Sequence, residues 1–265
     1  IYLKGRPKLK FDVLSINSGI ESNYKEIEGA HRNCVPVKPI SKLANNFLKE
    51  IKNFNSIAFI GGGAGSVELA LALKKRLKDT INNFEITIVS GKNGILSSFP
   101  EKTKQISLNA LKAADIKLLE NKEVVQVKKD KLIMSDGSFL NVEKSILSTN
   151  AMAPKWIEKS DLELNEEGFV VVNNAFQTNH KFIFAAGDIV DFNEENLKKT
   201  GVFAVRSGKP LAKSIRNYIL LDKNFTYKFN KHYLSLIGLS NGLAIASKYN
   251  FSYSTKLNFY LKKIY

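Results

Sequence analysis

The chain has 265 residues, 44% hydrophobic and 25% charged, which is enough to bury one or two ordinary cores. Its single cysteine, Cys34, excludes an intramolecular disulfide, a Cys-x-x-Cys pair and a thiolate metal cluster, and with them disulfide-reductase chemistry. The 40 basic and 25 acidic residues give a net charge of +15, but the lysines are dispersed, so we expect a solvated surface, no nucleic-acid partner and no metal site.

The N-terminal part predicts one strand and one helix. Residues 11–16 have the length and flanking turns of a buried strand, which Asn17, Ser18 and Gly19 end. Apolar residues at helical spacing predict a helix from residue 40 to residue 53. Cys34 lies in the polar loop between them, where it is either an inert thiol or a lone peroxide-reactive nucleophile.

The most informative run is a strand, a glycine-rich turn, a helix and a second strand. Residues 57–60 are apolar, Gly61 to Glu68 form the turn, and leucines then recur every four residues. Residues 85–89 give the next apolar strand. This order is what a parallel sheet requires.

The glycine-rich turn carries the chemistry. A diphosphate at a helix N-terminus needs backbone N–H groups aimed at it and no Cβ in the way, which Gly61 and Gly63 supply. Ser66 replaces the third glycine of the Gly-x-Gly-x-x-Gly pattern and is small enough for close helix–strand packing. The alternative is a tight strand–helix connection without a ligand. The predicted nicotinamide-dinucleotide contacts are Gly61, Gly62, Gly63, Ala64, Gly65, Ser66, Glu68, Ser90, Lys92 and Asn150.

Two of these positions bear on the choice and placement of the nucleotide. Glu68 lies in the first helical turn, where it either stabilises the positive end of the helix dipole or lies near the nicotinamide. An acid after the second strand would bind the adenosine ribose of NAD, but Ser90, Gly91 and Lys92 stand there, which favours NADPH unless Lys92 is an ordinary surface lysine.

The rest of the chain alternates between short strands and helices. Residues 116–119, 124–129 and 131–134 lead through Asp136-Gly137 to Leu140 in the pattern of a small antiparallel meander. The other predicted elements are helices at 101–114 and 200–221 and strands at 145–148, 168–172, 182–186, 233–239 and 243–247. Residues 54–150 therefore form one predicted NAD(P)H-binding domain, followed by a linker at 151–154.

Three separated stretches resemble the FAD-dependent pyridine nucleotide-disulfide oxidoreductases. Residues 60–70 resemble the NAD-domain fingerprint, residues 182–189 the second FAD fingerprint, and residues 14–19 the strand that leaves the FAD domain. The resemblance implies an α/β fold with two Rossmann-like domains, parallel sheets and FAD and NAD(P)H as cofactors. It also implies FAD contacts for Gly187, Asp188, Val202 and Phe203, and makes Arg206 a candidate near the flavin ring.

The same resemblance sets the domain boundaries. It implies a partial FAD-binding domain at 1–53 and 151–225 and a partial interface segment at 226–265. No glycine-rich run precedes Leu14 and residue 1 is Ile, so we expect a fragment whose FAD-binding domain, the first of the two, is incomplete.

The branch that the chain most resembles is the type II NADH dehydrogenase-like proteins, including the form fused to selenophosphate synthase. The implied function is hydride transfer from NAD(P)H to flavin and on to an unknown acceptor, a quinone or another, without a protein nucleophile. Val205-Arg206 replaces the Ala-Gln that respiratory members carry beside the quinone. The alternative is a non-catalytic nucleotide-binding or regulatory module that has lost flavin.

The C-terminal tail, residues 255–265, mixes apolar and aromatic side chains with lysines. It is either a helix packed on the protein body or a peripheral membrane contact. We find no signal peptide and no apolar run of about 18 residues, so we expect a cytoplasmic protein that is membrane-peripheral if the tail binds lipid.

Overall fold

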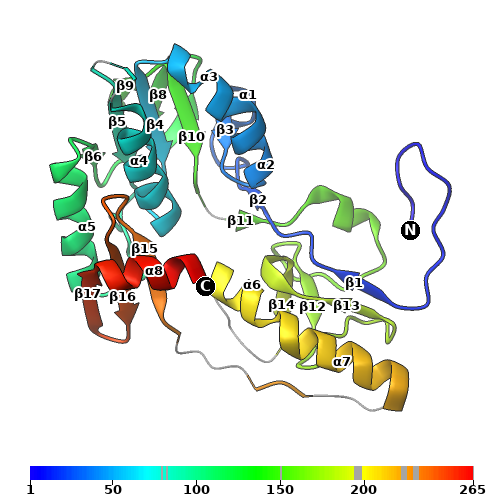
Figure 1. Ribbon diagram of the computed structural model, residues 1–265. Coiled ribbons are helices and arrows are strands. Elements are labelled where there is room, and N and C mark those ends of the chain that lie inside the picture. The colour runs from blue at the N-terminus through cyan, green and yellow to red at the C-terminus, as the bar shows by residue number, and fades with distance from the viewer. Residues whose placement is uncertain are drawn as a thin grey trace. The chain divides into compact units, whose positions relative to one another are not determined.

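The computed structural model describes residues 1–78, 80–81, 83–149, 151–193, 199–221, 226–228 and 233–264 (Figure 1). The chain forms two compact units. Unit 1 comprises residues 1–20 and 151–231, and unit 2 comprises residues 21–150 and 232–265. Within the described residues, no helix is both long and apolar enough to cross a bilayer.

Unit 2 is built on a five-stranded sheet in the order β3-β10-β4-β5-β6. All of its described strand pairs are parallel, with Ile60 opposite both Val89 and Leu147. The strands are β3 (Cys34–Pro36), β10 (Lys144–Leu147), β4 (Ser56–Ile60), β5 (Glu85–Val89) and β6 (Lys117–Leu119). Since parallel strands end at the same edge, the residues after them lie close together.

Alternating residues of β4 face two different cores. Ile57 and Phe59 pack with α4 (Ala64–Leu77), α5 (Glu101–Ala113) and the helical stretch 40–53, whereas Ala58 and Ile60 pack with the meander. That stretch contains α2 (Ile40–Lys42), η1 (Leu43–Phe47), α3 (Leu48–Glu50) and η2 (Ile51–Asn53), and the meander contains β7 (Val124–Val127), β8 (Lys131–Met134) and β9 (Phe139–Asn141) beside α1 (Ala30–Asn33). Both faces of the sheet are thus covered, as a parallel sheet needs.

The C-terminal residues form an antiparallel sheet of β15 (Ser235–Gly238), β16 (Ala244–Lys248) and β17 (Phe251–Thr255), followed by α8 (Lys256–Ile264). This sheet packs on α5, where the buried hydroxyl of Thr103 donates to Ser247 at 3.0 Å and lies 2.6 Å from Ser252. Ile237 and Ile245 belong to the same core as β4. The C-terminal segment is therefore part of unit 2.

Unit 1 has two short parallel pairs, β1 (Leu14–Ile16) with β13 (Ile183–Ala185), and β12 (Val170–Val172) with β14 (Val190–Phe192). Its core is centred on Phe169, Phe176 and Phe184. The other elements of the described chain are α6 (Gly201–Arg206), α7 (Gly208–Leu221), η3 (Lys155–Lys159), η4 (Gly187–Ile189), β2 (Glu21–Ser22) and β11 (Ala151–Met152).

The predicted α/β class with a parallel sheet and an antiparallel meander is confirmed. One assignment within it is wrong: residues 117–119 are not in the meander. They pair in parallel with residues 87–89, because α5 carries the chain back to the amino edge of the sheet. The predicted strand at 11–16 is shorter, Leu14–Ile16, and β17 was not predicted.

The division of the chain differs from the predicted boundaries in two segments. Residues 21–53 lie in unit 2 and not with residues 1–20, because β3 pairs with β10 and Phe47 and Ile51 enter the core of the sheet. Residues 232–265 also belong to unit 2 and are not a separate segment.

Candidate functional site

The glycine-rich turn of unit 2 lies where the strand order reverses. From β4 the chain passes through α4 to β5 on one side, while β10 lies on the other side of β4. Gly61 comes directly after β4 at this point, and Ser148 directly after β10. In open α/β sheets, ligands bind outside the carboxyl ends of the strands at this switch point.

Gly61 and Gly62 are glycines because neighbouring segments of the chain come too close for a side chain. Gly61 has φ +114°, and a Cβ there would lie 2.5 Å from the carbonyl oxygen of Ser148. A Cβ on Gly62 would lie 2.8 Å from the Cβ of Ser90 and 2.9 Å from the carbonyl oxygen of Gly94. Both residues therefore shape the turn from within.

Gly63 and Gly65 differ from Gly61 and Gly62, because no neighbouring atom lies close to the position that a Cβ would take. A Cβ on Gly63 would meet nothing within 4 Å, and one on Gly65 would lie 3.7 Å from Ser148 Oγ. Gly63 is the N-cap of α4, and no described side chain caps that end. The first N–H groups of α4, from Ala64 onward, have no partner within the helix and are available to a phosphate. The turn thus fits the diphosphate of a dinucleotide.

The serines predicted as contacts lie inside the protein. Ser66 and Ser90 are fully buried, and neither Oγ has a hydrogen-bond partner among the described residues. Ser66 allows α4 to pack closely, as predicted from its size, whereas Ser90 lies beneath Gly62 and does not face solvent. Lys92 is exposed, and Asn150 lies outside the described residues.

Glu68 is held by the C-terminal segment. Its Oε1 accepts hydrogen bonds from the backbone N–H of Gly238 and from Lys262 Nζ, which also donates to the carbonyl oxygen of Leu236 at 2.9 Å. Both charged side chains are about one-third exposed, at 29% and 35%. Glu68 therefore joins α4 to β15 and α8. Sequence reasoning missed Lys262 because 194 residues separate it from Glu68.

Sequence reasoning also missed Glu120, which comes directly after β6 at the carboxyl edge of the sheet. Its Oε1 accepts a hydrogen bond from the N–H of Ile95 at 3.1 Å and lies 2.6 Å from the position of a Cβ on Gly94. Gly94 has φ +65°, so the loop that leaves β5 turns back against this carboxylate. An exposed Glu in a short polar segment between two strands gave no local signal for this contact.

In unit 1, the predicted FAD-contact residues come after β13 in the same way. Gly187 has φ +81°, and a Cβ there would lie 2.5 Å from Asn17 Oδ1 and 3.8 Å from the Cβ of Ala204. The end of β1, the Gly187-Asp188 turn and α6 therefore meet at one place. Asp188 is half-buried in η4.

A lysine accompanies this turn. Lys199 donates to the carbonyl oxygen of Val190 at 2.7 Å and lies 3.6 Å from the ring centroid of Phe169. Burial lowers the pKa of Lys199, against the nearby negative charges of Asp191, Asp188 and Glu167. A cation thus lies within electrostatic range of Asp188.

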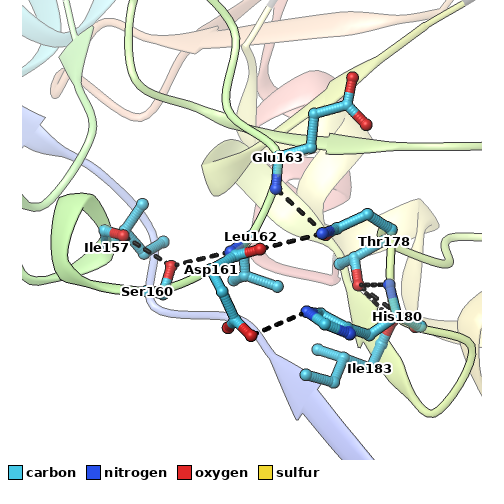
Figure 2. A network of polar contacts seen from close by, with 9 residues as sticks. Ile157, Ser160, Asp161, Leu162, Glu163, Thr178, His180 and Ile183 are labelled. Carbon is cyan, nitrogen blue, oxygen red and sulfur yellow. Dashed lines mark hydrogen bonds and ion pairs between the residues drawn. The ribbon is translucent and has the colours of Figure 1, made fainter.

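The start of β13 is anchored by a network of polar contacts (Figure 2). Thr178 Oγ1 donates to the carbonyl oxygen of Ile183 at 3.1 Å and accepts from the N–H of His180 at the same distance. His180 Nε2 lies 3.2 Å from Asp161 Oδ2. The strand that delivers Gly187 is therefore fixed at its first residue.

The remaining predicted flavin contacts lie on α6, which Thr200 caps by accepting from the N–H of Phe203 at 3.5 Å. Val202 and Phe203 are half-buried, whereas Val205 and Arg206 are exposed. Ser207 separates α6 from α7, so the helix predicted at 200–221 is two helices.

Cys34 does not have the properties of a reactive thiol. It lies within β3, paired with Ser145, and burial raises the pKa of its thiol to about 12, although the charge of Lys144 acts in the opposite direction. A nucleophilic cysteine needs a lowered pKa and exposure. The structure therefore favours the inert thiol.

A parallel sheet with an open glycine turn at its switch point is the arrangement typical of α/β proteins that bind dinucleotides. Residues 3–208 match the family described as pyridine nucleotide-disulphide oxidoreductase, and the chain belongs to this family.

Curated relatives agree with this assignment. The chain is 25% identical over 283 residues to the type II NADH:quinone oxidoreductase of Haemophilus influenzae, covering 92% of this chain and 64% of that protein. It is 22% identical over 252 residues to a probable NADH dehydrogenase of Dictyostelium discoideum, covering 84% and 56%. The chain thus spans less than two thirds of either relative.

Solved structures share the fold. An FAD-dependent pyridine nucleotide-disulphide oxidoreductase from Desulfovibrio vulgaris superposes with a TM-score of 0.72 at 20% identity, over 91% of this chain and 61% of that one. An NAD-dependent persulfide reductase from A. fulgidus gives a TM-score of 0.73 at 17% identity, over 91% and 44%.

Proposed function

We propose that this chain forms the nucleotide-binding part of an FAD-dependent NAD(P)H oxidoreductase. The observation that carries the proposal is the turn at Gly61–Gly65, which lies at the switch point of a parallel sheet and leaves open space at Gly63. Membership of the family and relatives named for NADH support it.

In this proposal the protein binds and orients, and the cofactors carry the redox chemistry. The N–H groups at the start of α4 hold the diphosphate, and Gly61 and Gly62 keep the turn tight enough to reach it. In unit 1, Gly187, Asp188, Val202 and Phe203 are the residues that would hold FAD, which supplies hydride acceptance when bound. Lys199 balances the charge of Asp188.

The nucleotide site is tested by calorimetric titration of the chain with NADH and NADPH. Gly63→Ala places a methyl group in the open space at the N-cap, at a φ of −72° that alanine adopts freely. We expect the Kd of the bound nucleotide to rise at least about tenfold, a loss of about 1.4 kcal/mol. Gly208→Ala is the matched control, because a Cβ there also meets nothing within 4 Å and Gly208 lies in unit 1.

Equal affinity in the wild type and Gly63→Ala would overturn the assignment of the turn to nucleotide binding. Oxidoreductase activity is tested separately on the purified protein after incubation with FAD. Loss of flavin absorbance on addition of NADH or NADPH supports the enzyme. A colourless protein that still binds nucleotide supports the alternative, a non-catalytic module that has lost flavin.

We also propose a peripheral membrane contact for the tail. Leu257 and Tyr260 of α8 are 65% and 61% exposed, and Phe251 and Tyr253 of β17 are 80% and 54% exposed. Aromatic and aliphatic side chains beside lysines suit a bilayer interface. The fraction of protein that sediments with anionic liposomes should fall in the double variant Leu257→Ser with Tyr260→Ser. An unchanged fraction would exclude the tail as the membrane contact. Tyr265 lies outside the described residues.

A further inference from the structure

The edge of the sheet beside the glycine turn lacks the acid that usually binds the adenosine ribose of NAD. That acid comes after the second strand, where this chain has Ser90. Ser90 is fully buried beneath Gly62, so its hydroxyl cannot reach a ribose at the sheet edge. The exposed loop at 91–93 has Lys92 as its only charged side chain.

A carboxylate reaches this loop from the neighbouring strand instead. Glu120 comes after β6, which lies beside β5 in the sheet, and its carboxylate contacts the loop at Gly94 and at the N–H of Ile95. The backbone continues this pairing, because the N–H of Lys122 donates to the carbonyl oxygen of Ser90 at 3.0 Å. Glu120 is exposed, so a ligand at this edge of the sheet can approach it.

We propose that Glu120 is the residue that sets nucleotide choice and that it favours NADH over NADPH. The inference rests on the proposed function of the glycine turn. The 2′-phosphate of NADPH carries a charge of about −1.5 to −2 at neutral pH, which a carboxylate at this edge repels. A ribose hydroxyl can instead donate a hydrogen bond to that carboxylate.

Two nearby lysines, Lys122 and Lys92, differ in how far they can offset the repulsion between Glu120 and a 2′-phosphate. The ammonium of Lys122 is bound to Asp136 and also donates to Ser138 Oγ at 3.2 Å, so it is directed to the meander turn. Lys92 is exposed, and within the described part of the chain no ion pair holds it. The charge near the ribose 2′-position is therefore set by two side chains, Glu120, which is fixed by Ile95, and Lys92 on the loop.

Glu120→Gln separates charge from structure. The glutamine Oε1 still accepts a hydrogen bond from Ile95, so the loop keeps its anchor while the negative charge is lost. Calorimetric titration should show the ratio of the NADPH Kd to the NADH Kd falling about tenfold, with the melting temperature unchanged. Glu85→Gln is the matched control: the same loss of one charge, at the opposite edge of the same sheet, should leave the ratio unchanged.

Glu120→Ala adds a second test. It removes both charge and anchor, so both nucleotides should weaken while the ratio still shifts toward NADPH. The inference is overturned if both nucleotides bind and their ratio is the same in wild type and Glu120→Gln, or if Glu85→Gln shifts it equally. Binding of neither nucleotide to the wild type would instead overturn the proposed function.

Discussion

Gly61 in unit 2 and Gly187 in unit 1 each follow a buried strand and have positive φ, with a neighbouring oxygen 2.5 Å from the place where a Cβ would be. The oxygens differ in kind: that near Gly61 belongs to the backbone of Ser148, whereas that near Gly187 belongs to the exposed side chain of Asn17. A backbone carbonyl at the end of a paired strand cannot move away, but a side chain can rotate. The first turn is therefore rigid by construction, and the second can adapt.

The elements after the two glycines also differ. Gly61 leads into the 14-residue α4 with open space at its cap, and Gly187 leads into the short η4 and then β14. A long helix provides a dipole and free N–H groups for an anion, which a single turn cannot provide to the same extent. The comparison therefore favours the first turn for the proposed diphosphate binding, whereas the second turn presents one carboxylate, Asp188.

Gly61→Ala should give the largest effect. The substitution combines an unfavourable φ with a backbone clash, and we expect unit 2 to lose about 3 kcal/mol of unfolding free energy. Urea denaturation followed by far-UV circular dichroism measures the loss. A loss below about 1 kcal/mol would mean that the strand of Ser148 can shift, and the contrast between the two turns would fail.

Gly187→Ala should cost less, about 1 to 2 kcal/mol, because Asn17 can turn its amide into solvent. Trp156, the chain's single tryptophan, lies in unit 1, so its fluorescence reports this unit during denaturation. The double variant Asn17→Ala with Gly187→Ala should recover part of the loss. Ser148→Ala should recover nothing in Gly61→Ala, because that clash involves a backbone atom. Equal rescue of both variants would contradict the distinction.

The sequence predicts well the elements that are determined within one short segment, and poorly those that depend on pairing with a distant segment. The run from residue 56 to residue 89 was predicted nearly to the residue, because strand, glycine turn and helix have different periodicities within one short segment. β3 was missed because three residues ending in Pro36 have no period, and its partner β10 lies more than 100 residues further on.

The candidate site divides in the same way. The glycines were found because their spacing is a property of one turn, while the contacts of Glu68 with Lys262 and of Glu120 with Ile95 depend on tertiary packing. Ser90 was predicted as a nucleotide contact because it stands where an acid after the second strand would bind the ribose of NAD. The structure buries it fully beneath Gly62 instead.

The pH dependence of unfolding gives a further test of whether the two units unfold separately, because one unit contains the thiol of Cys34. The folded-state pKa of Cys34 is about 12, above its ordinary value of 9.0, so the unfolded chain releases the thiol proton first as the pH rises. The contribution of the Cys34 thiol to the free energy of unfolding is fully present below pH 9.0. It is lost as the pH rises toward about 12, where the folded thiol also ionises. At one pH unit above the ordinary pKa the loss is about 1.4 kcal/mol.

Only unit 2 contains this thiol, so the loss should appear in the circular dichroism transition of that unit and be absent in Cys34→Ala. Trp156 fluorescence provides the internal reference, because Trp156 lies in unit 1. The unfolding free energy that it reports should have the same pH dependence in wild type and Cys34→Ala. A matching difference in both signals would show that the units unfold together, and the separate costs expected for Gly61→Ala and Gly187→Ala would then have to be measured as one transition.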